Sequence, residues 1–183
     1  MKFGRMMPLL KEIELKQVVG HWEMDTVESN RAGRSCLLVL TERMTRQETT
    51  RKLPDQTRAS VVAAIDQLEY KFGDLFPLIF KSITIDNGSE FQDCEGIEKS
   101  KLFEGQRTKL FFCHPYSSFE RGSNEKQNQM LRRHFPKGTN FDLVEDEDVE
   151  WATDWLNYYP RKIFDWGNSE TFFNKEVLTL CAL

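Results

Sequence analysis

The chain has 183 residues, of which 39% are hydrophobic and 12% aromatic. This composition is typical of a globular protein, and the length suits one domain with a buried core. The formal net charge of -4 and the isoelectric point near 5.5 argue against nucleic-acid binding through bulk charge, although a local basic patch is compatible with them. The sequence has no transmembrane-length apolar run, no visible signal peptide and no CxxC cysteine spacing. We therefore expect a cytosolic protein with reduced thiols, no membrane partner and no zinc site.

The first part of the chain predicts an arm followed by three strands. We expect an arm or linker over residues 1–19 and one domain over residues 20–183. Alternating or apolar runs over 21–28, 35–41 and 47–53 indicate strands, and the more polar third strand suits a sheet edge. Because the connections between them are short, the three strands are predicted to form an antiparallel meander.

One helix and two further strands follow. Thr57 is a suitable N-cap for a helix in which Val61, Ile65, Leu68 and Phe72 keep helical spacing. Residues 82–86 predict a fourth strand, and residues 109–113 predict a fifth after an irregular polar region. The order is three strands, a helix, and two more strands, which indicates an α/β domain.

The last third of the sequence predicts helices. One spans residues 123–135 and ends before Pro136 and Gly138. A second spans 145–159 and begins with a run of acids that favour the helix dipole. In this second helix Trp151, Trp155 and Tyr158 have i, i+4, i+7 spacing, which we interpret as its core-facing stripe.

Three acids occur in contexts that suit metal-dependent phosphoryl transfer. Asp25 lies in the first strand, Asp86 ends the fourth, and Glu125 opens the helix over 123–135. Carboxylates on core-forming elements are costly to bury unless they are paired or bound to metal. Each acid alone also has an ordinary structural explanation: Asp25 as an exposed strand residue, Asp86 as part of an Asp-Asn-Gly turn, and Glu125 as a solvated helix residue.

Longer segments of the sequence carry a family resemblance. HWEMDTV, TIDNGSEF, FCHPYSSFERGSNEKQNQMLRRHFPKGT and YYPRKIF resemble the catalytic core of bacterial insertion-sequence transposases of the IS-thirty type. That family belongs to the retroviral-integrase superfamily, and the resemblance runs from about Gly20 to about Phe173. It implies an RNase H-like fold, with a mixed five-stranded sheet flanked by helices. Two departures are visible: a longer segment between Asp86 and Glu125, and DWGNSETFF in place of the usual Thr-Pro element after PRK.

The resemblance implies the site as well as the fold. Asp25, Asp86 and Glu125 match the two aspartates and the glutamate that hold two Mg²⁺ or Mn²⁺ ions, and Asp25 is our choice to bridge them. Two such ions about 3.5–4 Å apart can activate the attacking oxygen and stabilise charge on the phosphoryl group. Glu90 is an alternative ligand to Asp86, and His114 is a candidate for a supporting contact. The residues expected to contact DNA follow or flank Glu125, and they are Asn124, Lys126, Asn128, Gln129, Arg132, Arg133 and Lys137.

The implied function is DNA strand cleavage and strand transfer on transposon ends and target DNA by a homo-oligomer that acts at the bacterial nucleoid. One alternative is an RNase H-like nuclease that hydrolyses without joining. The other is a catalytically silent remnant that binds DNA or oligomerises, and the intact trio Asp25, Asp86 and Glu125 argues against it. No helix-turn-helix pattern precedes Gly20, so the domain that recognises element ends is expected to be missing.

Overall fold

The fold was analysed in a computed structural model that describes residues 18–113 and 122–182. The arm predicted over 1–19 lies outside the described residues except for Val18 and Val19, and His114 also lies outside them. Within the described part, five strands form one mixed sheet in the order β3-β2-β1-β4-β5. The strands are β1 (His21–Val27), β2 (Cys36–Glu42), β3 (Glu48–Leu53), β4 (Ser82–Ile85) and β5 (Lys109–Phe112).

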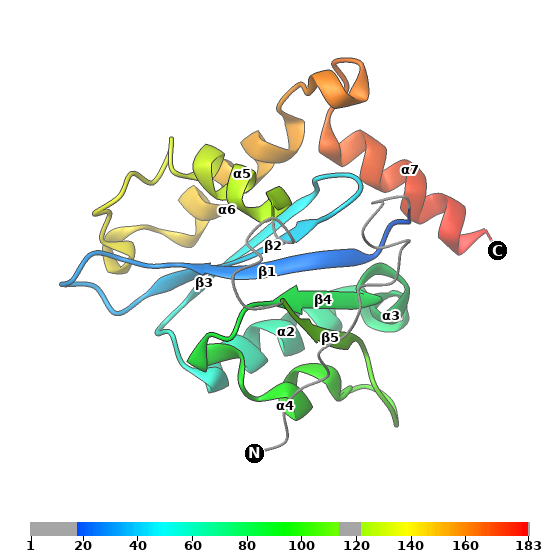
Figure 1. The fold of residues 1–183 in the computed structure, drawn as a ribbon, viewed down its shortest axis with the longest axis horizontal. Coiled ribbons are helices and arrows are strands. Elements are labelled where there is room, and N and C mark those ends of the chain that lie inside the picture. The colour runs from blue at the N-terminus through cyan, green and yellow to red at the C-terminus, as the bar shows by residue number, and fades with distance from the viewer. Residues whose placement is uncertain (1–17, 114–121, 183) are drawn as a thin grey trace.

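The helices cover both faces of this sheet (Figure 1). They are α2 (Arg58–Phe72), α3 (Phe76–Ile79), α4 (Cys94–Glu98), α5 (Gly122–Leu131), α6 (Asp146–Tyr158) and α7 (Ser169–Cys181). Short 3₁₀ turns lie between them at η1 (Gly73–Leu75), η2 (Ser89–Phe91), η4 (Phe141–Leu143) and η5 (Lys162–Phe164). Helices α2 and α4 lie on one side of the sheet, and α5 and α6 lie on the other. No described helix combines the length and the apolar character needed to span a membrane.

The strand predictions are confirmed to within about one residue. β1, β2 and β3 form the antiparallel meander, and the polar strand β3 lies at the edge. β1 and β4 then pair in parallel, as do β4 and β5. Thr57 caps α2, because its hydroxyl accepts a hydrogen bond from the Ser60 amide.

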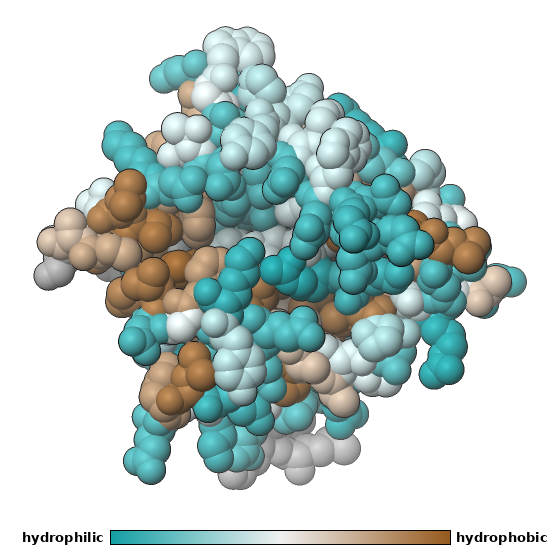
Figure 2. Space-filling model, turned by 180° about the vertical axis from the view of Figure 1, so that it is seen from behind, coloured by the Kyte–Doolittle hydropathy of each residue, from teal (hydrophilic) through white to brown (hydrophobic). Residues whose placement is uncertain are grey.

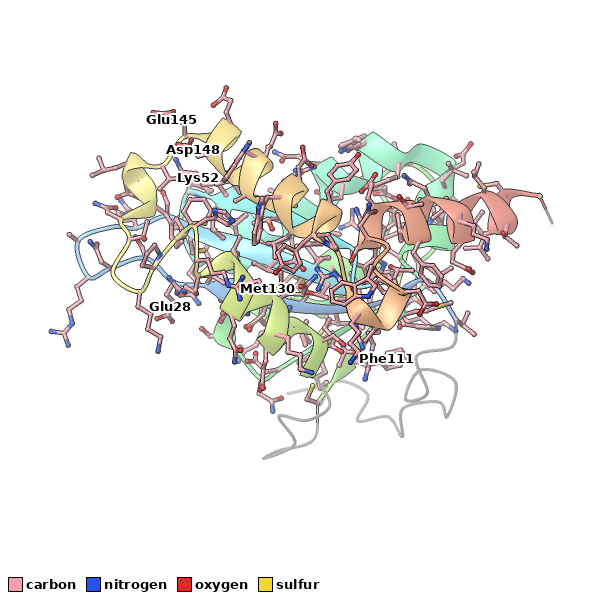
Figure 3. The ribbon with its side chains drawn as sticks, turned by 90° about the horizontal axis from the view of Figure 1, so that it is seen from above. Glu28, Lys52, Phe111, Met130, Glu145 and Asp148 are labelled. Atoms are coloured by element: carbon pink, nitrogen blue, oxygen red, sulfur yellow. The ribbon has the colours of Figure 1, made fainter. Side chains whose placement is uncertain are left out.

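Two hydrophobic clusters lie on the two faces of the sheet because side chains alternate along each strand. On the α2 face, Trp22 and Met24 of β1 pack with residues of the helix such as Ile65. On the α5–α6 face, Val27 and Val39 pack with residues such as Leu156. Figure 3 shows α5, with Met130 labelled, and α6 above the sheet, with Glu145 and Asp148 at the beginning of α6 close to Lys52. Lys52 Nζ donates to the Val144 carbonyl, which ties β3 to the start of α6.

Two expectations about the C-terminal helices are wrong. α5 ends at Leu131 rather than 135, because the amides of Arg133 and His134 bond the carbonyls three residues earlier and so tighten the last turn. The aromatic stripe of α6 faces the core only at Trp155, which packs against the cluster on the α5–α6 face, since Trp151 is 61% exposed and Tyr158 is 58% exposed. Smaller residues are buried instead, and they are Val149, Ala152, Thr153, Leu156 and Asn157.

Asn157 holds α6 against the outer edge of β3. The Glu48 amide donates to Asn157 Oδ1 at 2.8 Å, and Asn157 Nδ2 donates to the Glu48 carbonyl at 3.0 Å. The side-chain amide therefore makes the two bonds that a neighbouring strand would make.

The polar segment before β5 is a folded unit. Lys99 and Gln106 form an isolated antiparallel bridge, and the buried Arg107 anchors the segment to α2. Its guanidinium lies 2.9 Å from Glu69 and 2.6 Å from Asp66. The segment between Asp86 and Glu125 includes this anchored hairpin. From behind, polar residues cover much of the middle of the molecule, and hydrophobic residues gather on the side where α7 ends (Figure 2).

Candidate active site

Asp25 and Asp86 lie just beyond the paired positions of the parallel strands β1 and β4. Their parallel register joins Glu23 to Thr84, and both aspartates lie two residues further along their chains. Continued by two residues, this register places Asp25 opposite Asp86 on the same face of the sheet. Adjacent strands lie about 4.8 Å apart, so two carboxylates at these positions lie on neighbouring strand ends.

Asp25 is half-buried, and its carboxylate accepts a hydrogen bond from helix α5. Its Oδ1 accepts from the Thr26 amide at 2.9 Å, and its Oδ2 accepts from Asn128 Nδ2 at 3.1 Å. The same Asn128 amide group donates to Asn124 Oδ1 at 2.7 Å. Asp25 therefore contacts α5 directly, which an exposed strand acid would not do.

Glu125 lies in the first turn of α5 and is exposed to solvent. It precedes Asn128 by three residues, so the two lie on neighbouring positions of one helix face. Among residues 18–113 and 122–182, however, no three His, Cys, Asp or Glu side chains are close enough to form a metal site. The three acids therefore do not form a preassembled metal site in the described part of the chain.

Asp86 forms a tight turn with Gly88. Its Oδ1 accepts from the Gly88 amide at 2.9 Å. A Cβ at Gly88 would lie 2.7 Å from Glu90 Oε2 and 3.0 Å from Asp86 Oδ1, so a side chain here would displace the Glu90 carboxylate. The φ angle of Gly88 is −55°, so the backbone at this position does not itself require glycine. Asp86 can therefore form the Asp-Asn-Gly turn through Oδ1 and still be a candidate metal ligand.

A buried polar cluster that the sequence reasoning missed lies beneath α5. Glu23 is fully buried, lies 3.2 Å from Arg43 Nε and accepts from the Asn124 amide at 2.8 Å. Arg46, in the β2–β3 turn, donates to the Ser123 hydroxyl. These contacts place a negative charge and hydrogen-bond donors at the start of the helix that bears Glu125. One signal was present in the sequence: Glu23 and Asp25 are acids on the same face of one strand.

The cluster continues through Gln127 to the YYPRKIF segment. Gln127 Nε2 donates to the Arg46 carbonyl at 2.6 Å, and Arg161 Nη2 donates to Gln127 Oε1 at 3.0 Å. Glu48 lies nearby in β3 and accepts from the Thr41 hydroxyl at 2.7 Å. Burial raises the pKa of Glu48 to about 8, and the charge of Arg161 acts in the opposite direction.

The residues expected to contact DNA fall into two groups. Lys126, Gln129, Arg133 and Lys137 are exposed. Asn124 is only 1% exposed, and its amide groups bond Glu23, so it faces the interior in this structure. Asn128 is half-buried against Asp25.

Arg132 is half-buried and its guanidinium donates to main-chain oxygens. Its partners include the Phe135 carbonyl at 3.4 Å and the Glu28 carbonyl at 3.3 Å. Burial lowers the pKa of Arg132 from its usual value. Arg132 therefore helps to hold the end of α5 as well as lying beside the proposed DNA surface.

A hollow of about 400 Å³ lies between β3, α6 and α7, with Thr50, Asn157 and Glu170 in its lining. Asp25, Asp86 and Glu125 do not line it, so it is separate from the candidate site.

Relatives and structural neighbours agree with this arrangement. The chain is 32% identical over 155 residues to the transposase for insertion sequence element IS1086 of Cupriavidus metallidurans, and the match covers 85% of this chain and 43% of that protein. It is 34% identical over 150 residues to the transposase for IS4351 of Bacteroides fragilis, covering 82% of this chain and 43% of the relative. Transposase InsI for IS30C of Escherichia coli is 29% identical over 167 residues, and the match covers 91% of this chain and 41% of that protein. The chain spans less than half the length of these relatives.

The fold has a solved counterpart. The catalytic core domain of BIV integrase superposes with a TM-score of 0.60 at 16% identity, covering 87% of this chain and 97% of that one. This similarity establishes the RNase H-like fold of the integrase catalytic core. The family described as "Integrase core domain" matches residues 16–118, which is more than half of the chain. The chain therefore belongs to the integrase core family, and its relatives there are bacterial insertion-sequence transposases of the IS-thirty type.

Proposed function

We propose that this chain is the catalytic core of a DNA transposase that cleaves and joins DNA strands with two Mg²⁺ or Mn²⁺ ions. The observation that supports the proposal is that Asp25 and Asp86 each lie two residues beyond the paired residues Glu23 and Thr84 of parallel strands, with α5 bonded to Asp25. The names of the relatives, which are transposases, support DNA as the substrate and polynucleotidyl transfer as the reaction class.

The donor atoms fit the proposed metal. Mg²⁺ prefers hard oxygen ligands, and it is usually held by one or two carboxylates together with water and substrate phosphate. Asp25 and Asp86 would supply those carboxylates, and Glu125 would approach from α5 when substrate and metal are present. The absence of a ready-made cluster of three acids in the described residues is compatible with such a site. When bound, the two ions would activate the attacking oxygen and neutralise charge on the phosphate.

The protein's own groups have separate tasks in this proposal. Asn128 orients the Asp25 carboxylate, and the Gly88 amide orients Asp86. The exposed residues Lys126 and Gln129 of α5, and Arg133 in the turn that follows it, would contact the DNA backbone. Self-association of the chain, which joining two DNA ends would favour, remains part of the proposal.

The test is nicking of supercoiled plasmid and joining of a 3′-hydroxyl oligonucleotide, each in Mg²⁺ or Mn²⁺. Asp25→Asn, Asp86→Asn and Glu125→Gln should each lower both activities by at least about a hundredfold, the scale on which removal of a catalytic group acts. Glu104→Gln removes an exposed acid from the hairpin before β5 and serves as the matched control. Full activity of Asp86→Asn would refute the site, and nicking without joining would identify a hydrolytic nuclease.

A further inference from the structure

Glu90 is the centre of a closed hydrogen-bond triangle beside the candidate site. Its Oε1 accepts from the Thr26 hydroxyl at 2.9 Å and from Gln56 Nε2 at 2.8 Å. Gln56 Nε2 also donates to the Thr26 hydroxyl at 2.9 Å. The three residues come from β1, from the segment before α2 and from η2, so the triangle joins three parts of the chain.

This triangle lies beyond the point where β1 pairs with β4. That parallel pairing ends at Glu23 and Thr84, two residues before Asp25 and Asp86, whereas β1 remains paired with β2. Thr26 directly follows Asp25, and Glu90 follows Asp86 by one short turn. The Thr26–Glu90 bond therefore links β1 to the segment that follows β4, beyond the end of the β1–β4 ladder.

The segment that carries Glu90 is itself anchored. Arg58 Nε donates to the Ser89 carbonyl at 2.9 Å, and Arg58 Nη2 donates to Gln92 Oε1 at 2.6 Å. Phe91 is fully buried in the core. Glu90 thus projects from a turn that is held in place, and its hydrogen bond to Thr26 ties β1 to that turn.

We propose that Glu90 is a positioning residue that sets the separation of Asp25 and Asp86 through its hydrogen bonds to Thr26 and Gln56. The inference rests on the proposed function, because it assigns a metal site to the two aspartates. It attributes the effect of Glu90 to the acceptor oxygen and not to the negative charge. A glutamine at this position offers the same acceptor, whereas an alanine offers none.

The test is Mn²⁺ binding by the whole 183-residue chain, measured by calorimetry and by the spin-resonance signal of free Mn²⁺ well below the melting temperature. Glu90→Ala should weaken binding by about tenfold or more, as loss of partners that orient metal ligands usually does. Glu90→Gln should bind Mn²⁺ like the unmodified chain. The double variant Thr26→Val/Gln56→Leu removes both donors and should reproduce Glu90→Ala.

Several outcomes would overturn this inference. If Glu90→Gln weakened binding as much as Glu90→Ala, the charge of Glu90 would act on the metal directly. If Glu90→Ala or the double variant bound Mn²⁺ as tightly as the unmodified chain, the positioning role of Glu90 would be refuted. Glu104→Gln controls for the loss of one negative charge, and thermal melts without metal show that each variant is folded.

A failure of the proposed function gives a different result. In that case Asp25→Asn and Asp86→Asn would bind Mn²⁺ as tightly as the unmodified chain. If the two aspartate variants lose binding and Glu90→Ala does not, the metal site stands and only the role of Glu90 is refuted.

Discussion

Glu48 illustrates how one buried side chain couples this fold to pH. It is fully buried between β3 and α6, and its partners include the Thr41 hydroxyl. Because burial favours the neutral form, the folded protein keeps a proton on Glu48 up to about pH 8, whereas the ordinary value is 4.5. The stability that this group contributes is therefore complete at low pH and is lost as the pH rises through that interval.

The variant Glu48→Gln should reveal this dependence. Glutamine resembles the protonated carboxyl group, so it avoids the cost of burying a charge at high pH. We expect the melting temperature of Glu48→Gln minus that of the unmodified chain to rise between about pH 5 and pH 8 and to level off above it. Thermal melts across this pH range measure the difference in melting temperature, with Glu104→Gln as the exposed control. A difference that stays constant with pH would contradict the assignment.

At the scale of elements, the attachment of α5 to the sheet depends on buried charge. Glu23 accepts from the Asn124 amide and pairs with Arg43, so one carboxylate joins β1, the β2–β3 turn and the first turn of α5. Removing one partner from a buried ion pair leaves the other charge poorly compensated in the interior. The catalytic helix is thus linked to the stability of the sheet beneath it.

Glu23→Gln should therefore lower the free energy of unfolding by about 3 kcal/mol, the lower end of what breaking a buried pair costs. Amide hydrogens of α5 should also exchange faster, because the first turn loses a charged acceptor. Denaturant titration and hydrogen exchange measure the two effects. An unfolding midpoint equal to that of Glu104→Gln would show that Glu23 contributes nothing beyond surface charge.

The sequence predicted the elements better than their faces. Local signals, such as the Thr57 cap and the alternation in β1, act within a few residues and were confirmed. The stripe of Trp151, Trp155 and Tyr158 had true helical spacing, but α6 approaches β3 closely and buries the smaller Ala152 and Leu156 instead. The pairing of Glu23 with Asn124 joins residues far apart in the chain, so no local pattern could predict it.

The prediction of the site has the same limit. The motifs predict Asp25 and Asp86 as site residues, and both lie two residues beyond the Glu23–Thr84 pair of β1 and β4. The triangle around Glu90 depends on the path of η2 after β4, which the DNG turn alone does not define. Placement of Arg132 also required the structure, since its main-chain partners arise where α5 ends early.

At the scale of the whole molecule, binding to DNA has to overcome a net charge of -4. The proposed basic surface for this binding consists of the exposed Lys126 and Gln129 of α5 and Arg133 just after it. Contacts to phosphate position DNA without reading its sequence, so this chain should bind weakly and with little sequence preference.

The double variant Lys126→Ala/Arg133→Ala should weaken binding to all sequences about equally. It should also reduce the slope of log K against log salt by about 1.8, or about 0.9 for each lost phosphate contact. Fluorescence anisotropy at several salt concentrations measures both quantities. Lys101→Ala, an exposed lysine on the hairpin before β5, is the matched control and should leave the slope unchanged. A tight, sequence-selective complex would contradict the proposed mode of binding.

The pairing of Asn157 with Glu48 bears on how copies of the chain can come together. An open strand at the border of a sheet is a template for strand exchange and for aggregation. Here a carboxamide from α6 occupies the outward amide and carbonyl of Glu48, and it does so within the same molecule. Sheets of two copies therefore cannot fuse along β3 at Glu48 unless α6 first moves away.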